Sequence, residues 1–288
     1  MQLQILVPID GSSHSFAGLV YAVVSFPNAT ITTLHVQASG QDVPSECDSP
    51  ERDGEDQQPI LARAIEIASA YNHDVNTALE GGEPHRAILE HIAEHDIDHV
   101  VMGSHGESPV ESPFLGRVTE AVVRRSPIST TIIPESRPKL LRREFPGRIL
   151  VPVDGSDQSL AAIEYTVDRF PDARITLFHA VAPSLVDEPA TMDEGRGDLI
   201  DSLTRRGASL LDSAVQSIEN DDIVVESVLE HGPPAQSILD YAIDNAFDQI
   251  IMGSHGRSLP ARIIFGSVAE TVSRRSTVPV TIIKDRPA

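Results

Sequence analysis

The strongest constraint on the fold is an internal repeat. The segment ILVPIDGS at 5–12 returns as ILVPVDGS at 149–156, and VMGSHG at 101–106 returns as IMGSHG at 251–256. The two offsets are 144 and 150 residues, so about six residues were gained between the two segments. A period of this length is that of a whole domain and is far too long for a solenoid repeat. The 288-residue chain is therefore expected to contain two tandem domains.

The joint between the two copies is the segment PESRPKLLRREFPG at 134–147. Its prolines and charged residues are typical of a linker between domains. We expect a first domain at 1–137, a linker at 138–147 and a second domain at 148–288.

Short apolar runs alternate with helix-like segments within each copy. In the first copy ILVPI is followed by SHSFAGLVYAVVSF and then by TITTLHV, and the alternation continues to a final β-branched run, ISTTII. Five strands separated by about four helices predict an α/β domain with a parallel, doubly wound sheet. One of these helices should bury a face made of Ile60, Leu61, Ala64, Ile65 and Ala68. The polar stretches at 37–58 and 182–197 should be mobile or become ordered by a ligand.

The charge balance excludes some classes of partner. The chain has 43 acidic and 22 basic residues, a net charge of -21, which would repel the phosphates of DNA or RNA. This acidity, with only two lysines, also indicates a salt-adapted cytoplasm. No apolar run of 18 residues and no signal-peptide pattern occurs, so we expect a cytoplasmic protein without a membrane partner. The single cysteine, Cys47, excludes an intrachain disulfide.

Glycine-rich loops follow the fourth predicted strand of each copy. Ligands of doubly wound sheets bind outside the carboxyl ends of the strands, where the strand order reverses. Asp10 and Asp154 end the first strands and can reach the same crevices as the loops. Glycine lets the backbone approach a ligand closely, and the helix that follows offers free N–H groups to an anion. The loop glycines are Gly103, Gly106 and Gly116 in the first copy and Gly253, Gly256 and Gly266 in the second.

Each of these sequence features also has a purely structural interpretation. Asp154-Gly155-Ser156 taken alone is equally well a turn with a helix cap, and isolated glycines after strands are more often turns. The hydroxyl of Ser267 can cap the last helix or donate to a phosphate oxygen. His105 and His255 indicate loop polarity more than a metal site, because no further ligand lies at a suitable spacing. The combination of these features in one repeat favours a binding site.

The segments ILVPVDGS, the strand that contains His179, and the pattern G-x-x-G-x9-G-S resemble the universal stress protein family over nearly all of both copies. The resemblance implies a Rossmann-like fold in tandem and, in the nucleotide-binding members, ATP held by the glycine loop. It implies that Asp154 lies near the adenosine and any Mg²⁺, and that Val153 and Val181 line the base pocket. Ribose and phosphates would be held by Gly253, Gly256, Gly266 and Ser267. The corresponding first-copy residues are Ile9, Asp10, Val36, Gly103, Gly106 and Gly116, with Arg117 in place of the serine.

We therefore expect a stress-response protein with no catalytic residues that binds ATP, with or without Mg²⁺, mainly in its second domain. The segment between the second and third glycines has Arg257 and Arg262 in the second copy, but Glu107 and Glu111 in the first. Two alternatives remain open: a dimerisation module without nucleotide, and a weak adenine-nucleotide hydrolase, for which no paired carboxylates can be argued.

The resemblance also implies that the two copies form a pseudo-dimer. In it the terminal strands ISTTII and VPVTII would pair antiparallel about a pseudo-two-fold axis. The same kind of surface allows a homodimer.

Overall fold

The computed structural model describes residues 2–37, 57–106, 115–134, 146–182, 193–218, 223–256 and 265–284. The chain divides into two compact units, Met1–Arg143 and Glu144–Ala288. Each unit is described by itself below. The domain limits expected from the sequence and the pairing of the two terminal strands therefore stay predictions.

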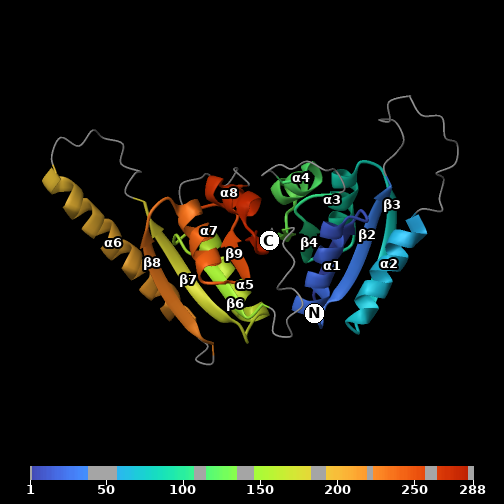
Figure 1. The fold of residues 1–288 in the computed structure, drawn as a ribbon, viewed down its shortest axis with the longest axis horizontal. Coiled ribbons are helices and arrows are strands. Elements are labelled where there is room, and N and C mark those ends of the chain that lie inside the picture. The colour runs from blue at the N-terminus through green and yellow to red at the C-terminus, as the bar shows by residue number, and fades with distance from the viewer. Residues whose placement is uncertain are drawn as a thin grey trace. The chain divides into compact units, whose positions relative to one another are not determined.

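The first unit is a parallel sheet in the order β3-β2-β1-β4-β5 (Figure 1). Helices α1 and α2 contact each other, as do α3 and α4, so helices cover the sheet in pairs. The strands are β1 (Gln4–Ile9), β2 (Thr30–Gln37), β3 (Val75–Gly81), β4 (His99–Gly103) and β5 (Ser129–Ile133). The helices are α1 (Ser13–Ser25), α2 (Gln57–Ala70), α3 (Pro84–Glu94) and α4 (Arg117–Arg125).

The second unit repeats this arrangement in the order β10-β9-β6-β7-β8, again with parallel pairs (Figure 1). The strands are β6 (Arg148–Pro152), β7 (Arg174–Val181), β8 (Val225–His231), β9 (Gln249–Gly253) and β10 (Val280–Ile283). The helices are α5 (Asp157–Arg169), α6 (Asp193–Gln216), α7 (Pro234–Asp244) and α8 (Ser267–Arg275). Within the described residues, the predicted fold class of five parallel strands and four helices in each copy is confirmed.

Local sequence signals explain where several helices begin. Ser12 precedes α1, and its Oγ accepts a hydrogen bond from the backbone N–H of Ser15 at 3.1 Å. Ser156 precedes α5 and accepts in the same way from Ser159 at 3.2 Å. Such caps satisfy one of the N–H groups that have no partner in the first turn of a helix. Proline opens both α3 and α7, where its missing N–H has no cost.

Two details of the predicted elements are wrong. Ile65 is 46% exposed, whereas Ala64 and Ala68 of the same helix α2 are fully buried. The buried stripe follows the i, i+4 spacing from Ile60 through Ala64 to Ala68 and takes up Ile67 as a half-buried residue instead of Ile65. The polar stretch expected at 182–197 is also too long, because α6 begins at Asp193. Residues 38–56 and 183–192 lie outside the described residues, so the mobility of these stretches stays a prediction.

The core of the first unit joins strand residues to one helical face. Leu6, Leu34 and Val100 from three neighbouring strands pack with Ile88 and Ile92 of α3. Strands β4 and β5 are buried along their whole length because helices cover both faces of the sheet, whereas no residue of the edge strand β3 is fully buried. Among the described residues, no helix is long and apolar enough to cross a membrane.

Candidate functional site

A cavity of about 310 Å³ lies in the second unit at the carboxyl ends of β6, β7 and β9. This volume lies at the lower end of the range usual for small-molecule sites. The first strand β6 stands between β9 and β7, so the strand order reverses beside the cavity, where doubly wound sheets bind ligands. The described residues that line the cavity are Pro152, Val153, Asp154, Ser156, Ser159, Phe178, His179, Ala180, Pro234, Ile238, Met252, Gly253, His255, Gly256, Gly266, Ser267, Val268 and Ala269.

Asp154 is fixed in the cavity wall by the turn that follows β6. Its Oδ1 accepts hydrogen bonds from the backbone N–H of Ser156 at 2.9 Å and from the Ser156 hydroxyl at 2.6 Å. Gly155 has φ of +75°, a conformation that favours glycine. The segment Asp154-Gly155-Ser156 is therefore both a turn with a helix cap and part of the cavity wall, so the two interpretations of the sequence are compatible.

Two loop glycines permit close contacts across the top of the sheet. A Cβ added at Gly256 would overlap Oδ2 of Asp154, so the loop backbone lies directly against the carboxylate. A Cβ added at Gly253 would lie 2.7 Å from Cβ of Gln158 and 2.9 Å from its carbonyl carbon. Glycine at 253 thus allows helix α5 to pack against the end of β9. Gly253 therefore contributes only backbone atoms to the wall of the cavity.

The N-terminus of α8 faces the cavity through Gly266, Ser267 and Val268. Gly266 occupies the cap position without any side-chain cap, and its own N–H donates to the Ser254 carbonyl at 2.7 Å. Ser267 is the first helical residue and does not cap α8, so of the two roles open to its hydroxyl only donation to a ligand is left. The first N–H groups of a helix have no partner within it and carry a partial positive charge. This helix end can accept an anionic group.

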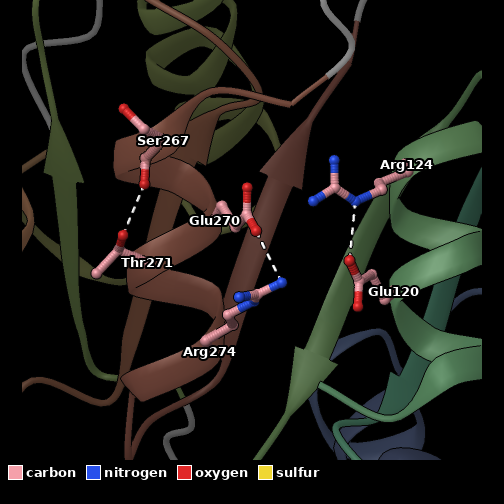
Figure 2. Close-up of polar contacts among 6 residues, drawn as sticks. All are labelled: Glu120, Arg124, Ser267, Glu270, Thr271 and Arg274. Carbon is pink, nitrogen blue, oxygen red and sulfur yellow. Dashed lines mark hydrogen bonds and ion pairs between the residues drawn. The ribbon is translucent and has the colours of Figure 1, made fainter. Parts of the chain in front are cut away.

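Polar contacts farther along α8 run between residues four positions apart (Figure 2). The Thr271 hydroxyl donates to the backbone carbonyl of Ser267 at 2.8 Å, and Nη2 of Arg274 lies 2.7 Å from Oε1 of Glu270. In α4 Nε of Arg124 lies 3.1 Å from Oε1 of Glu120. In the last helix of each unit, one arginine near the end, Arg124 or Arg274, is therefore paired with a glutamate one turn earlier.

Strand β7 adds residues to the cavity that differ in part from those expected. Ala180 lines it together with Phe178 and His179, whereas Val181, which is buried, is not among the described lining residues. The ring of His179 donates from Nδ1 to the Val153 carbonyl at 2.7 Å and so ties the ends of β6 and β7 together. The repeat in the sequence is enough to identify Ala180 as the residue that corresponds to Val36. His35 contacts the Ile9 carbonyl in the same way, and the offset of 144 residues then aligns Val36 with Ala180.

The corresponding residues of the first unit repeat this backbone geometry. Oδ1 of Asp10 accepts from the Ser12 N–H at 3.0 Å, and a Cβ added at Gly106 would overlap the Asp10 carboxylate. Gly116 caps α4 with its backbone alone, as Gly266 caps α8. Ile9 is buried at the end of β1, Val36 packs against the core, and Gly103 packs closely on His14. The first unit differs at the start of its last helix, where Arg117 replaces Ser267.

The two charged segments between the loop glycines lie outside the described residues. Arg257 and Arg262 in the second unit, and Glu107 and Glu111 in the first, are known from the sequence alone. Their contribution to a ligand site is an argument from charge and proximity in the chain.

The geometry defines a tandem α/β protein with a cavity at the strand switch of its second unit. The universal stress protein family matches the sequence twice, over residues 1–134 and 146–284, and the chain belongs to this family.

Individual universal stress proteins are similar to this chain in sequence and in structure. A universal stress protein of Methanocaldococcus jannaschii is 32% identical over 141 residues, which cover 48% of this chain and 81% of the relative. Another, of Mycobacterium tuberculosis strain H37Rv, is 25% identical over 97% of this chain and 96% of its own. The crystal structure of a universal stress protein of Archaeoglobus fulgidus has a TM-score of 0.69 at 23% identity, covering 98% of this chain and 96% of that one. This structural likeness extends over both units.

Proposed function

We propose that this protein is a cytoplasmic stress-response protein that binds an adenine nucleotide, ATP, mainly in its second unit. The observation that carries the proposal is the cavity in which Asp154, Gly256 and the start of α8 meet. A nucleotide needs an apolar place for its base, polar groups for its ribose and positive potential for its phosphates. The cavity offers all three types of environment.

The polyphosphate would lie at Gly266 and Ser267, where backbone N–H groups and the positive end of α8 favour an anion. The base would lie against Val153, Phe178 and Ala180, whose apolar atoms line the other part of the cavity. Asp154 would then stand beside the ribose, or hold a Mg²⁺ ion that accompanies the phosphates. Val181 has its backbone on the same strand end and would contribute to the base pocket only indirectly.

Charge favours the second unit over the first. A unit charge about 6 Å from a phosphate is worth about 3 kcal/mol at an effective dielectric constant of about 20, before screening by salt. Arg257 and Arg262 attract a triphosphate, whereas Glu107 and Glu111 repel it. Even a quarter of that energy for each charge separates the two affinities by tenfold or more. Arg117 offsets part of this difference in the first unit.

The role we propose is regulatory or protective. Asp154 is the single carboxylate among the described lining residues, and the ring of His179 is engaged with the Val153 carbonyl. A pair of carboxylates for hydrolysis is therefore not found among the described lining residues, and Nδ1 of His255, the other histidine there, lies 3.1 Å from the Ser254 hydroxyl. Members of the family are generally stress proteins rather than enzymes.

Native mass spectrometry of gently purified protein tests the proposal and separates it from the two alternatives. Retained ATP, or saturable binding of added Mg-ATP, is the expected result. Absence of both would favour a dimerisation module without nucleotide. Release of ADP over many turnovers would instead favour a hydrolase.

A further inference from the structure

A second group of polar side chains lies in the first unit, between strand β3 and helix α3. Among the described residues, Glu80, His91 and His95 offer three ligand atoms that all lie within 4.8 Å of one another. His91 is buried, Glu80 is half-buried and His95 is exposed. We call these three residues the β3–α3 cluster. Neither the cavity of the second unit nor the glycine loops include it.

The strand and the helix aim these side chains at one another. Glu80 and Ala78 are two residues apart and so lie on the same face of β3, and Ala78 packs on the core that contains Ile88 and Ile92 of α3. His91 is three residues beyond Ile88 on that helix, and its Nδ1 lies 2.5 Å from Oε1 of Glu80. Packing of α3 on the sheet therefore fixes the contact between His91 and Glu80.

His95 follows His91 by one helical turn. Residues four apart share one face of a helix, and the centres of the two imidazole rings are 4.2 Å apart. Two histidines at this spacing on a helix are a known arrangement for binding one metal ion. Because His95 is the cap at the end of α3 and is exposed, an ion held here would be reachable from solvent.

The second unit has the same acidic residue but neither histidine. The offset of 150 residues aligns Glu80 with Glu230, His91 with Tyr241 and His95 with Asn245. Tyr241 packs against the rings of Phe178 at 5.1 Å and Phe247 at 5.7 Å, and burial raises the pKa of its phenol. Aromatic packing thus occupies the place that the imidazoles take in the first unit. The fold does not require histidine at either position.

We propose that the β3–α3 cluster binds a divalent transition-metal ion, with Zn²⁺ as the best match. Two imidazole nitrogens and one carboxylate oxygen form a ligand set that zinc uses with a water molecule as the fourth ligand. Two ligands about 2.1 Å from a tetrahedral ion lie about 3.4 Å apart. The contact between His91 and Glu80 is shorter than this, and all three ligand atoms lie within 4.8 Å of one another, so small side-chain rotations bring all three to a common ion. The ion would link strand β3 to the end of α3.

Titration of the metal-stripped, nucleotide-free chain with ZnCl₂ tests this proposal. It is best done in a Cys47→Ser background, which removes the thiol as a competing ligand. We expect one tight zinc site per chain and a higher melting temperature of the zinc-bound protein. Substitution of Co²⁺ should give the visible absorption of a tetrahedral ion with nitrogen and oxygen ligands.

His95→Ala is the informative variant because His95 is exposed, so its loss should leave the fold intact. It should weaken zinc binding about tenfold or more, as should Glu80→Gln. The double change His91→Tyr with His95→Asn, which copies the second unit, should abolish the site. His73→Ala is the matched control, since this half-buried histidine of the same unit lies outside the cluster. Absence of a tight site, or equal affinity in His95→Ala and His73→Ala, would overturn the proposal.

Discussion

The two units share the backbone contacts at the carboxyl ends of their strands and differ in the side chains placed around them. Each has an Asp-Gly-Ser turn that caps the first helix and a glycine pressed against the turn's carboxylate. Each also has a polar pair between the last two strands. His99 Nε2 lies 2.8 Å from Oγ1 of Thr131 in the first unit, and Nε2 of Gln249 donates to Oγ1 of Thr281 at 2.8 Å in the second.

The two units differ at positions where the fold does not require a particular side chain. The last helix opens with Arg117 in one unit and Ser267 in the other, while β3 and α3 have histidines where the second unit has Tyr241 and Asn245. The Thr119 hydroxyl donates to the Gly103 carbonyl at 2.8 Å, whereas Ala269 has no hydroxyl to do so. The two units therefore keep the same backbone geometry while the side chains around it change.

The largest effect is expected from Gly256→Val. A side chain at this position must displace the Asp154 carboxylate that the turn holds in place. We expect about a 100-fold loss of ATP affinity, or about 2.8 kcal/mol. The increase in melting temperature produced by ATP in the wild type should then disappear.

Gly106→Val is the matched variant in the first unit, where the same overlap with Asp10 would occur. It should leave the ATP-induced increase in melting temperature nearly unchanged. If Gly106→Val alone removed that increase, the nucleotide would belong to the first unit.

Lys284 gives the second unit a pH dependence that the first should lack. Burial lowers the pKa of Lys284 to about 8 from 10.5, and the aligned residue of the first unit is Pro134. Because the folded state disfavours the charged amine, the cost to stability is full below pH 8 and disappears as the pH rises toward 10.5. Lys284→Met should therefore stabilise the protein at pH 7, by on the order of 2 kcal/mol.

Thermal unfolding between pH 7 and 10.5 measures this effect. The advantage of Lys284→Met over the wild type should shrink across the range. Lys284→Arg, which stays charged throughout, should show no such gain in stability as the pH rises. A constant difference between Lys284→Met and the wild type would contradict the assignment.

A smaller effect is expected from removing the two positive charges between the loop glycines of the second unit. Arg257→Gln with Arg262→Gln should weaken ATP binding by about tenfold, or about 1.4 kcal/mol. The opposite change, Glu107→Arg with Glu111→Arg, should strengthen any binding by the first unit. Both effects should become smaller as salt is added, because screening shortens the range of the charges. Affinities that do not depend on salt would argue against this origin of the preference.

The smallest effect is expected at the helix caps, where the units should behave alike. Ser12→Ala and Ser156→Ala each remove a hydroxyl that accepts from a first-turn N–H. Each should cost about 1 kcal/mol. The rates of amide hydrogen exchange in α1 and in α5 measure the effect of each cap in its own unit. Faster exchange in only one of the two variants would show that the caps are not equivalent.

Sequence reasoning was most successful where a single local cause decides the structure. The repeated apolar runs predict all ten strands of the described residues, and Ser12, Ser156 and the opening prolines mark helix starts. Most of the expected second-unit residues meet at one cavity, because parallel strands end at a common edge of the sheet.

The remaining features depend on packing between elements and were missed. The resemblance implies Val181 at the base pocket, but Ala180 lines the cavity and Val181 is not among its described lining residues, because the lining depends on how β7 ends beside β6. The contact between Glu80 and His91 joins a strand to a helix eleven positions later, a distance at which no periodicity identifies a partner. Ile65 was placed on the buried face of α2 for its apolarity, although its neighbours Ala64 and Ala68 define that face.

The central claim is that the second of two similar units binds ATP, and isothermal titration calorimetry with Mg-ATP tests it most directly. The nucleotide-free chain should bind one ATP per chain at a dominant site. Gly256→Val or Gly266→Val should abolish that binding, and Gly106→Val should leave it nearly unchanged. Two equal sites per chain, or a single site lost only in Gly106→Val, would contradict the account.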